Sequence, residues 1–405
     1  MEIPVDNLNP RQTCQGRQRP ILYRPEGDDT AALQMRRIVK TYKTAAGDVT
    51  VLKGINADFY QGEFVSLVGK SGSGKSTIVN MITGIDRPTS GKVFINNVDI
   101  HSLNESNMAK WRGRNLGIIF QFYQLLPMLS LLENTMLPMD IANLYTPAER
   151  ISRAMDLLGM VGLAEFAHQM PGAVSGGQQQ AAAVARAIAN NPPFIIADEP
   201  TGNLDSKTAE SVIGIFEKLV EQGKTIVMVT HDPAITRRTN RTMLISDGEI
   251  IHPALSRAFP MLNHSQLLQA THQLSYHKYN PGEPIIRQGQ NNNQLYIVTS
   301  GQARVHVERS DGSNVFITCL QPGSYFGEIE LIRQEPAVAT ILADTQEPVE
   351  AISLNQETYY TLHAQSSVLQ NTLHKTAQER LRENIAVREI LSQKKPVDHD
   401  QTKLA

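Results

Sequence analysis

The stretch Gly69-Lys70-Ser71-Gly72-Ser73-Gly74-Lys75-Ser76-Thr77 decides the fold of the first half of the chain. An apolar run over 64–68 precedes it and an apolar helical pattern follows it, which is the context of a phosphate-binding loop, or P-loop. The glycines allow consecutive backbone amides to turn toward phosphate oxygens without a clash at Cβ. We therefore predict that residues 69–77 bind a nucleotide, with Lys75 at its β- and γ-phosphates and the Ser76 hydroxyl on Mg²⁺.

Two acidic residues end a second apolar run. The run Phe194-Ile195-Ile196-Ala197 is followed directly by Asp198 and Glu199. After a P-loop, an aspartate at this place is suited to bind Mg²⁺ directly or through water. The glutamate that follows is suited to act as a base that polarises the attacking water. Taken alone, the pair could also be a solvated strand end, so it is the P-loop that favours the catalytic interpretation.

Short apolar runs at 64–68, 194–197 and 226–229 are separated by helical patterns. Buried strands that alternate with helices predict an α/β fold with a parallel sheet. We assign this fold to residues 33–253. The polar residues 1–32 before it show no apolar period and are predicted to form a flexible arm.

Further motifs distinguish among P-loop proteins. Ser175-Gly176-Gly177-Gln178-Gln179-Gln180 followed by Arg186 resembles the signature of ATP-binding-cassette (ABC) proteins, Gln121 resembles their Q-loop, and 201–206 resembles their D-loop. His231 matches the switch histidine of this family, and Tyr42 matches the aromatic residue that stacks on adenine. Taken alone, these two would be better explained as structural residues, but the ordered set favours the functional interpretation.

The resemblance implies an ATP-hydrolysing enzyme with the P-loop ABC ATPase fold and with ATP and Mg²⁺ as ligands. It assigns nucleotide binding to Tyr42, 69–77, Gln121 and Asp205, metal binding to Ser76, Gln121 and Asp198, and catalysis to Lys75, Glu199 and His231. Ser175 and the amides of Gly176 and Gly177 would contact the γ-phosphate of ATP held by a second subunit, and Gln178 is also assigned to nucleotide binding. Because one chain has one cassette, two such sites require a homodimer, which ATP closes and hydrolysis opens.

Three segments, 84–91, 122–127 and 201–205, resemble the branch of this family that serves lipoprotein release and macrolide export. ATPases of that branch pair with a separate permease, which implies a cytoplasmic protein at the inner face of the membrane. Two alternatives stay open. One is a soluble ABC protein without a permease, and the other is a signalling protein that uses ATP binding as a switch and is controlled by a cyclic nucleotide or another small ligand.

One departure concerns the residues after the signature, where the family usually has Arg or Lys and this chain has Ala181-Ala182-Ala183. Loss of a charge-assisted contact typically costs about 1.5–3 kcal/mol. We therefore expect slower hydrolysis or altered coupling. Hydrolysis itself is still expected, because Lys75, Asp198, Glu199 and His231 are all present.

The composition is that of a globular protein and does not favour a nucleic-acid-binding or membrane-spanning protein. The chain has 405 residues, 41% of them hydrophobic and 19% charged, as in ordinary globular proteins. A net charge of −2 gives no reason to expect nucleic acid as a partner. The sequence contains no run of about 18 apolar residues, the length needed to span a bilayer. A membrane channel would therefore have to come from another chain. Cys14 and Cys319 are the only cysteines and are predicted to be thiols.

After residue 253 the pattern changes to short β-rich runs between Pro-Gly and Gly turns, which predicts a β-roll or jelly roll with flanking helices. Turn and core positions over 281–305 are spaced as in the cyclic-nucleotide-binding domain, and Phe326-Gly327-Glu328-Ile329 resembles the opening of its phosphate cassette. We expect a linker over 254–262, this domain over 263–375, an amphipathic helix over 376–395 and a tail over 396–405.

The cassette departs from the family pattern where the cyclic phosphate would bind. Glu328 could take the ribose hydroxyl, but Pro336 is followed by Ala337 instead of the expected arginine. Loss of that bidentate partner should weaken binding by about 2–3 kcal/mol, or roughly 30- to 150-fold. Glu330 adds a negative charge, and Arg333 is near enough in sequence to substitute for the missing arginine. The domain could bind a cyclic nucleotide, another small ligand or a partner protein, or reinforce the dimer; we favour a regulatory or interaction role.

Overall fold

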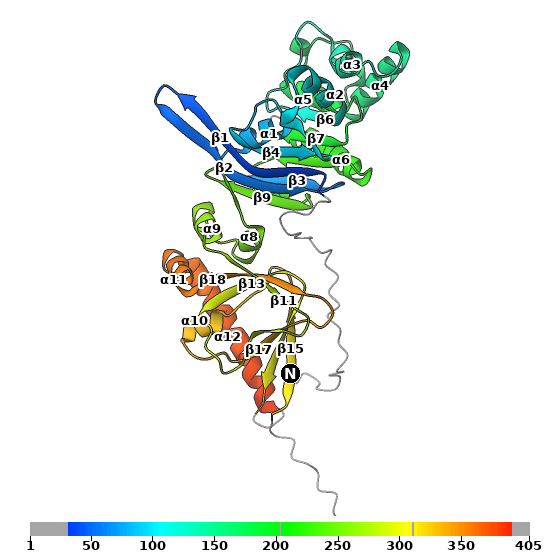
Figure 1. Ribbon diagram of the computed structural model, residues 1–405. Helices are drawn as coiled ribbons and strands as arrows, with labels where there is room; N and C mark the ends of the chain where they lie inside the picture. The colour runs from blue at the N-terminus through cyan, green and yellow to red at the C-terminus, as the bar shows by residue number, and fades with distance from the viewer. Residues whose placement is uncertain (1–30, 203, 310–311, 391–405) are drawn as a thin grey trace, which may run out of the picture. The chain divides into compact units, whose positions relative to one another are not determined.

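The computed structural model describes residues 31–202, 204–309 and 312–390. The chain divides after Pro253 into two compact units, each with its own hydrophobic core (Figure 1). Almost all of the predicted arm, and the whole of the predicted tail over 396–405, lie outside the described residues. Cys14 also lies outside them.

The first unit contains an antiparallel sheet of order β2-β1-β4-β5 and a six-stranded sheet of order β10-β9-β3-β8-β7-β6. From β9 to β6 neighbouring strands are parallel, and β10 is antiparallel to β9. The strands are β1 (Leu33–Thr44), β2 (Gly47–Phe59), β3 (Phe64–Val68), β4 (Ser90–Ile95), β5 (Val98–Asp99), β6 (Leu116–Ile119), β7 (Phe194–Asp198), β8 (Thr225–Val229), β9 (Arg241–Ser246) and β10 (Glu249–Ile251). The predicted α/β fold with a parallel sheet is confirmed.

Alternate side chains of the central strands enter two different cores, because successive side chains of a strand point to opposite faces. Ile195 and Ala197 of β7 pack with α3 to α6, whereas Phe194 and Ile196 pack with α1, α2 and the antiparallel sheet. Helices α3, α4 and α5 lie against one another at one end of this unit (Figure 1). The helices are α1 (Lys75–Thr83), α2 (Glu105–Asn115), α3 (Leu131–Ile141), α4 (Pro147–Met160), α5 (Gly176–Ala187), α6 (Ser206–Glu221) and α7 (Pro233–Thr236), with short 3₁₀ turns η1 (Ile100–Ser102), η2 (Ala164–Phe166) and η3 (Pro171–Ala173).

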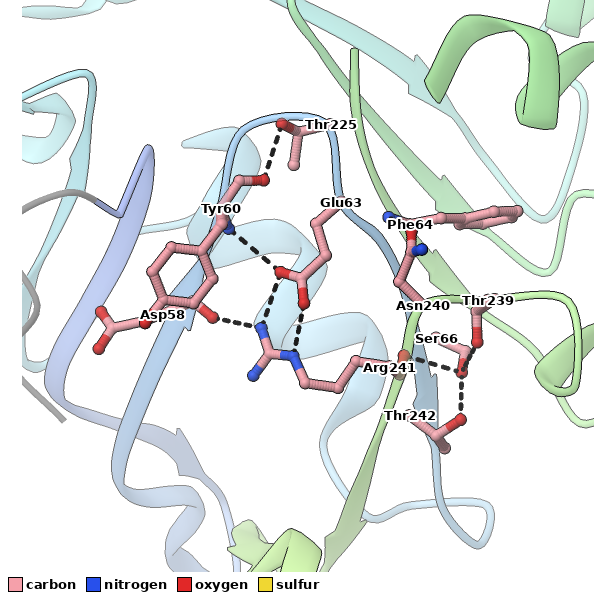
Figure 2. A network of polar contacts seen from close by, with 10 residues as sticks. All are labelled: Asp58, Tyr60, Glu63, Phe64, Ser66, Thr225, Thr239, Asn240, Arg241 and Thr242. Atoms are coloured by element: carbon pink, nitrogen blue, oxygen red, sulfur yellow. Dashed lines mark hydrogen bonds and ion pairs between the residues drawn. The ribbon is translucent and has the colours of Figure 1, made fainter. Parts of the chain in front are cut away.

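A polar network fixes the beginning of β3 (Figure 2). The guanidinium of Arg241, on β9, donates to both carboxylate oxygens of Glu63 at 2.7 and 2.9 Å and to the carbonyl of Asp58 at 2.6 Å. The Asn240 side chain accepts the amide of Phe64 at 2.7 Å. A bidentate pair that is mostly shielded from water is directional as well as favourable. It therefore holds the strand whose far end carries the P-loop.

The second unit consists of two antiparallel sheets, of order β11-β18-β13-β16 and β12-β17-β14-β15, with helices around them (Figure 1). Its strands are β11 (Ser275–Tyr279), β12 (Pro284–Ile286), β13 (Gln294–Ser300), β14 (Ala303–Glu308), β15 (Asn314–Leu320), β16 (Tyr325–Phe326), β17 (Thr340–Ala343) and β18 (Val349–Asn355). Its helices are α9 (His264–Thr271), α10 (Glu328–Arg333), α11 (Gln356–Gln365) and α12 (Ser367–Ile390), and α8 (Pro253–Ala258) begins at the unit boundary. The predicted β-rich second domain is confirmed.

Three details of this part of the chain differ from expectation. Helix α12 begins at Ser367 rather than at 376, because Leu369 and Leu373 already lie on its buried side. Cys319 is disulfide-bonded and is not the expected thiol, because the number of cysteines in a sequence does not decide whether they are oxidised. Part of the expected linker is helical, in α8. None of the helices within the described residues combines the length and apolar character needed to cross a membrane.

Candidate functional site

The P-loop connects the end of β3 to the first residue of α1, and its glycines are required by the backbone. Gly72 and Gly74 have φ values of 78° and 101°, in the left-handed region that favours glycine. A Cβ on Gly69 would collide with the Ile245 carbonyl, so the loop passes directly beside β9. Lys70, Ser71, Gly72 and Ser76 are exposed, whereas Gly69, Ser73, Gly74 and Lys75 are buried and Thr77 is half-buried. The loop therefore offers an open face at the helix N-terminus, where anions are favoured.

Lys75 folds back into the loop. Its Nζ donates to the carbonyls of Gly69 and Lys70, each at 2.9 Å. Burial lowers the pKa of Lys75, while the carboxylates of Glu199 and Asp198 oppose this shift. The Oγ of buried Ser73 has no hydrogen-bond partner among the described residues. A charge and an unused hydroxyl are thus held inside a loop that is shaped for phosphate oxygens.

Asp198 ends β7 and faces the P-loop. It accepts a hydrogen bond from the Ser76 side chain, and burial raises the pKa of its carboxyl despite that bond. Strands β3 and β7 run parallel with β8 between them, so the P-loop after β3 and Asp198 at the end of β7 lie at the same edge of the sheet. The two residues predicted to bind Mg²⁺ at this place are therefore adjacent.

Glu199 is held by residues from two other strand ends. Gln121 Nε2 donates to Glu199 Oε2 at 3.0 Å, and His231 Nε2 lies 2.8 Å from Glu199 Oε1. The Glu199 amide donates to the carbonyl of Val229 at 3.0 Å, and its φ of 47° turns the chain sharply after β7. A non-glycine residue in this region is uncommon and is often found at functional sites. The structure thus brings together three of the residues that were predicted from separate motifs.

Tyr42 lies beside the P-loop on β1. Its hydroxyl donates to Asp86 Oδ2 at 2.9 Å and hydrogen-bonds to the Thr77 side chain. Lys40 Nζ lies 4.8 Å from the centre of the Tyr42 ring, and it also binds Asp86 Oδ1 at 2.6 Å. Tyr42 is more than one third exposed. Lys40 and Asp86 carry no motif, so the sequence did not point to this support for the predicted adenine contact.

The signature residues lie at the N-terminus of another helix, α5. Ser175 is the N-cap of a capping box in which its Oγ accepts the Gln178 amide, and Gln178 Oε1 accepts the Ser175 amide. A Cβ on Gly176 would lie 2.7 Å from the hydroxyl of Tyr123, so this helix start packs against the Q-loop segment. Gly177 is half-buried in the first turn.

Two further contacts join α5 to the Q-loop segment. The half-buried Arg186 donates through its guanidinium to the carbonyls of Tyr123 and Gln124 at 2.9 and 2.6 Å, and Gln180 donates to the Phe120 carbonyl at 3.3 Å. The importance of Tyr123 was not predicted, because it depends on a contact that is distant in sequence. A shift of the signature helix would therefore be transmitted to the segment that follows Gln121.

Asp205 is the N-cap of α6. Its Oδ1 accepts the amides of Lys207 and Thr208, each at 3.0 Å, and its Oδ2 accepts the Thr208 hydroxyl at 2.6 Å. These bonds account for an aspartate at this position as a helix cap. The predicted nucleotide contact of Asp205 stays a prediction.

Ala181 is almost fully buried in the core between α3, α5 and the sheet, and Ala182 and Ala183 are fully buried. The short side chains therefore serve the packing of α5 in this chain. The expected effect on the rate of hydrolysis stays a prediction.

The donor chemistry around Ser76 and Asp198 suits Mg²⁺, which prefers hard oxygen ligands. Within 31–202, 204–309 and 312–390, no group of three or more His, Cys, Asp or Glu side chains is arranged to hold a metal ion by itself. Mg²⁺ characteristically binds through one or two protein oxygens together with substrate phosphates and water. The Ser76 hydroxyl and the Asp198 carboxylate fit that pattern.

In the second unit, the cassette residue Glu328 is fully buried and is bound by a residue of α12. Arg380 donates to Glu328 Oε1 and to the Tyr325 carbonyl, both at 2.8 Å, and its guanidinium lies over the Tyr325 ring. Burial raises the pKa of Glu328, and the charge of Arg380 opposes this shift. Arg333, the candidate substitute for the missing arginine, pairs instead with Glu335 at 2.5 Å on the surface.

Comparison with known proteins identifies both units. Residues 52–202 match the family profile described as ABC transporter, and residues 276–366 match the profile described as Cyclic nucleotide-binding domain. The chain is 42% identical over 220 residues to the lipoprotein-releasing system ATP-binding protein LolD of Hyphomonas neptunium, a match that covers 54% of this chain and 96% of LolD. It is also 42% identical over 238 residues to the macrolide export ATP-binding/permease protein MacB of Bartonella henselae, covering 59% of this chain and 36% of MacB.

A solved structure shares the same fold. It is the dimeric, post-hydrolysis ATP-binding cassette MJ0796 of Methanocaldococcus jannaschii, bound to ADP and Pi. The sequence identity is 42% and the TM-score is 0.53, over 54% of this chain and 97% of that one.

A parallel sheet that brings a P-loop and an acidic pair to one edge defines a P-loop nucleotidase. The chain belongs to the ABC transporter family, since it covers nearly all of LolD at this identity. It is an ATP-binding ATPase cassette of the LolD and MacB type, followed by a domain of the cyclic-nucleotide-binding family.

Proposed function

We propose that this chain is the ATP-hydrolysing subunit of a membrane transporter and that it works as a homodimer on a separate permease, at the cytoplasmic face of the membrane. The observation that carries the proposal is the position of Glu199. Its carboxylate is held by Gln121 on one oxygen and by His231 on the other, directly beside Asp198 and the P-loop. A protein that only bound ATP would not need an oriented base at this place.

The residues of the site have different roles in hydrolysis. The P-loop amides and Lys75 hold the β- and γ-phosphates, and the Tyr42 ring supports adenine. Glu199 orients the attacking water and accepts its proton, while Gln121 and His231 fix the direction in which the carboxylate points. Ser76 and Asp198, with Gln121 as a third oxygen donor, would hold Mg²⁺, which neutralises charge on the phosphate oxygens.

The arrangement of α5 supports a dimer. Ser175, Gly176, Gly177 and Gln178 form a helix N-terminus, which favours an anion, on a helix separate from the P-loop. In the proposed dimer this helix start contacts the γ-phosphate held by the other subunit, with Asp205 nearby. The relative MJ0796 has been solved as a dimer with ADP and Pi, which supports the same assembly here.

The segment after Gln121 supports a protein partner. Phe122 and Met128 are 72% and 75% exposed, and Leu126 is also exposed. Large apolar side chains that gather in an exposed segment are typical of interaction sites. Because Arg186 and Tyr123 link this segment to α5, a permease that binds here would sense closure of the dimer.

The proposal is tested by purifying the tagged chain from solubilised membranes of its own cells. We expect an integral-membrane permease to copurify and to stimulate ATP hydrolysis after reconstitution, and both effects to be lost in a Phe122→Ser/Met128→Ser double variant. Tyr276→Ser, which changes an exposed aromatic residue of the second unit, is the matched control. Stimulation that is unchanged in the double variant would exclude this segment as the permease contact.

A further inference from the structure

The phosphate cassette of the cyclic-nucleotide-binding domain contains an unusual carboxylate, that of Glu330, in addition to Ala337. Glu330 lies in the first turn of α10 and is mostly buried. Its carboxylate accepts its own backbone amide, the amide of Val338 at 3.4 Å and the side-chain amide of Asn292. Three N–H groups therefore converge on one buried carboxyl group, although burial raises its pKa.

The geometry that assembles this cluster is specific. Gly327, with a φ of 91°, packs so closely on the turn before β13 that a Cβ would collide with the Gln294 carbonyl and approach Asn292 Nδ2. Asn292 is oriented by a 2.8 Å bond to that same carbonyl. The Ala337 backbone is fixed to Gln290 at 2.9 Å, which sets the position of the next amide, Val338. The donors are thus held by turns and strands that do not depend on a ligand.

Val338 directly follows Ala337, the position at which an arginine would pair with a cyclic phosphate. We propose that Glu330 occupies the phosphate position of the cassette with its own carboxylate, so that this domain is closed to cyclic nucleotides. Two changes act together. Ala337 lacks the positive charge that attracts a phosphate, and the Glu330 carboxyl already occupies the N–H donors beside this position.

The second cassette acid is also engaged from within the chain. Glu328, the candidate for the ribose hydroxyl, is bound by Arg380 of α12. Both acidic groups that a nucleotide would meet in the cassette therefore have internal partners, and α12 is joined to the cassette without a ligand.

The test is calorimetric titration of the full chain with cyclic AMP and cyclic GMP, with the P-loop saturated by Mg-ADP. We expect no saturable binding to the wild type. Glu330→Ala/Ala337→Arg should gain saturable binding, at least 30-fold tighter than in Glu330→Ala alone. Glu335→Ala/Ala337→Arg changes the net charge equally but leaves Glu330 in place, so it should not bind. Saturable binding by the wild type, equal binding by both double variants, or no binding by a folded Glu330→Ala/Ala337→Arg protein would overturn the proposal.

Hydrogen exchange provides a test that does not depend on a gain of binding. Glu330→Ala should speed exchange of the Val338 amide by roughly ten- to a hundredfold, since it loses a hydrogen bond to a charged acceptor. Glu335→Ala, an exposed acid of the same loop, should leave it unchanged. Unchanged exchange in a folded Glu330→Ala protein would contradict the contact itself.

Discussion

His231 Nε2 lies 2.8 Å from Glu199 Oε1, although the two residues follow different strands of the parallel sheet. Gln121 binds the other carboxylate oxygen. The base is therefore positioned by an amide and an imidazole, one on each carboxylate oxygen, and has little freedom to turn away from the P-loop.

This relationship predicts the effect of His231→Ala. Removing the imidazole frees one carboxylate oxygen, so hydrolysis should slow, by up to the roughly 10²- to 10⁴-fold that a general base itself contributes. Affinity for ATP should change little, because His231 does not contact the P-loop residues described above. Phosphate release and equilibrium ATP binding measure the two effects. His168→Ala, at an exposed histidine of the same unit, is the control, and an equal effect there would remove the specific role of His231.

The signature helix offers a comparison between two capping boxes. Ser175 caps α5 and Thr146 caps α4 by the same pair of hydrogen bonds. Replacing either residue by Ala should cost about 1 kcal/mol of stability. Only Ser175→Ala should also slow ATP hydrolysis and weaken ATP-dependent dimerisation, because Ser175 is proposed to contact the nucleotide of the second subunit. Equal ATPase activity in the two variants would show that Ser175 only caps the helix and does not contact the nucleotide of the second subunit.

His252 predicts the pH dependence of the first unit. Burial lowers its pKa from 6.5 to about 4 in the folded chain. Below pH 6.5 the unfolded chain therefore binds a proton that the folded chain does not, and stability falls as the pH decreases toward about 4, by up to about 3 kcal/mol. Thermal unfolding of the wild type between these pH values should show this loss. His252→Gln should flatten the slope, whereas His168→Gln should keep it; an unchanged slope in His252→Gln would exclude this histidine as its origin.

The Arg380–Glu328 pair predicts how α12 is attached. Arg380→Ala leaves a buried carboxylate without its partner and should destabilise the second unit by about 3–5 kcal/mol. Replacing both residues by Met should restore much of that loss, because a packed apolar pair has no buried charge. Lys375→Ala breaks only the exposed pair with Glu379 on the same helix and should cost less than about 1 kcal/mol. Unfolding followed by circular dichroism measures all three, and equal losses for Arg380 and Lys375 would contradict the account.

The sequence predicted those features that depend on neighbouring residues. The P-loop, the strand before it and the acidic pair after β7 follow from glycine spacing and apolar runs, which are local. The contacts that orient Glu199 could be placed only through the family resemblance, since Gln121 is 78 residues away along the chain. The bonds from Arg186 to the Q-loop segment and from Arg380 to Glu328 join residues 50 or more positions apart and have no sequence pattern. The sequence shows only that Glu330 is acidic. The three N–H groups that donate to its carboxyl come from separate segments and are brought together only by the fold.

The most direct test of the central claim is phosphate release by purified wild type and by Glu199→Gln, with molecular mass measured in ATP and in its absence. We expect hydrolysis by the wild type, a loss of roughly 10²- to 10⁴-fold in Glu199→Gln, and a dimer of Glu199→Gln that persists in ATP. Glu210→Gln, at an exposed acid of α6 paired with Arg238, should behave as the wild type. Equal turnover by the wild type and Glu199→Gln would contradict Glu199 as the base, and a monomer at saturating ATP would contradict the proposed dimer.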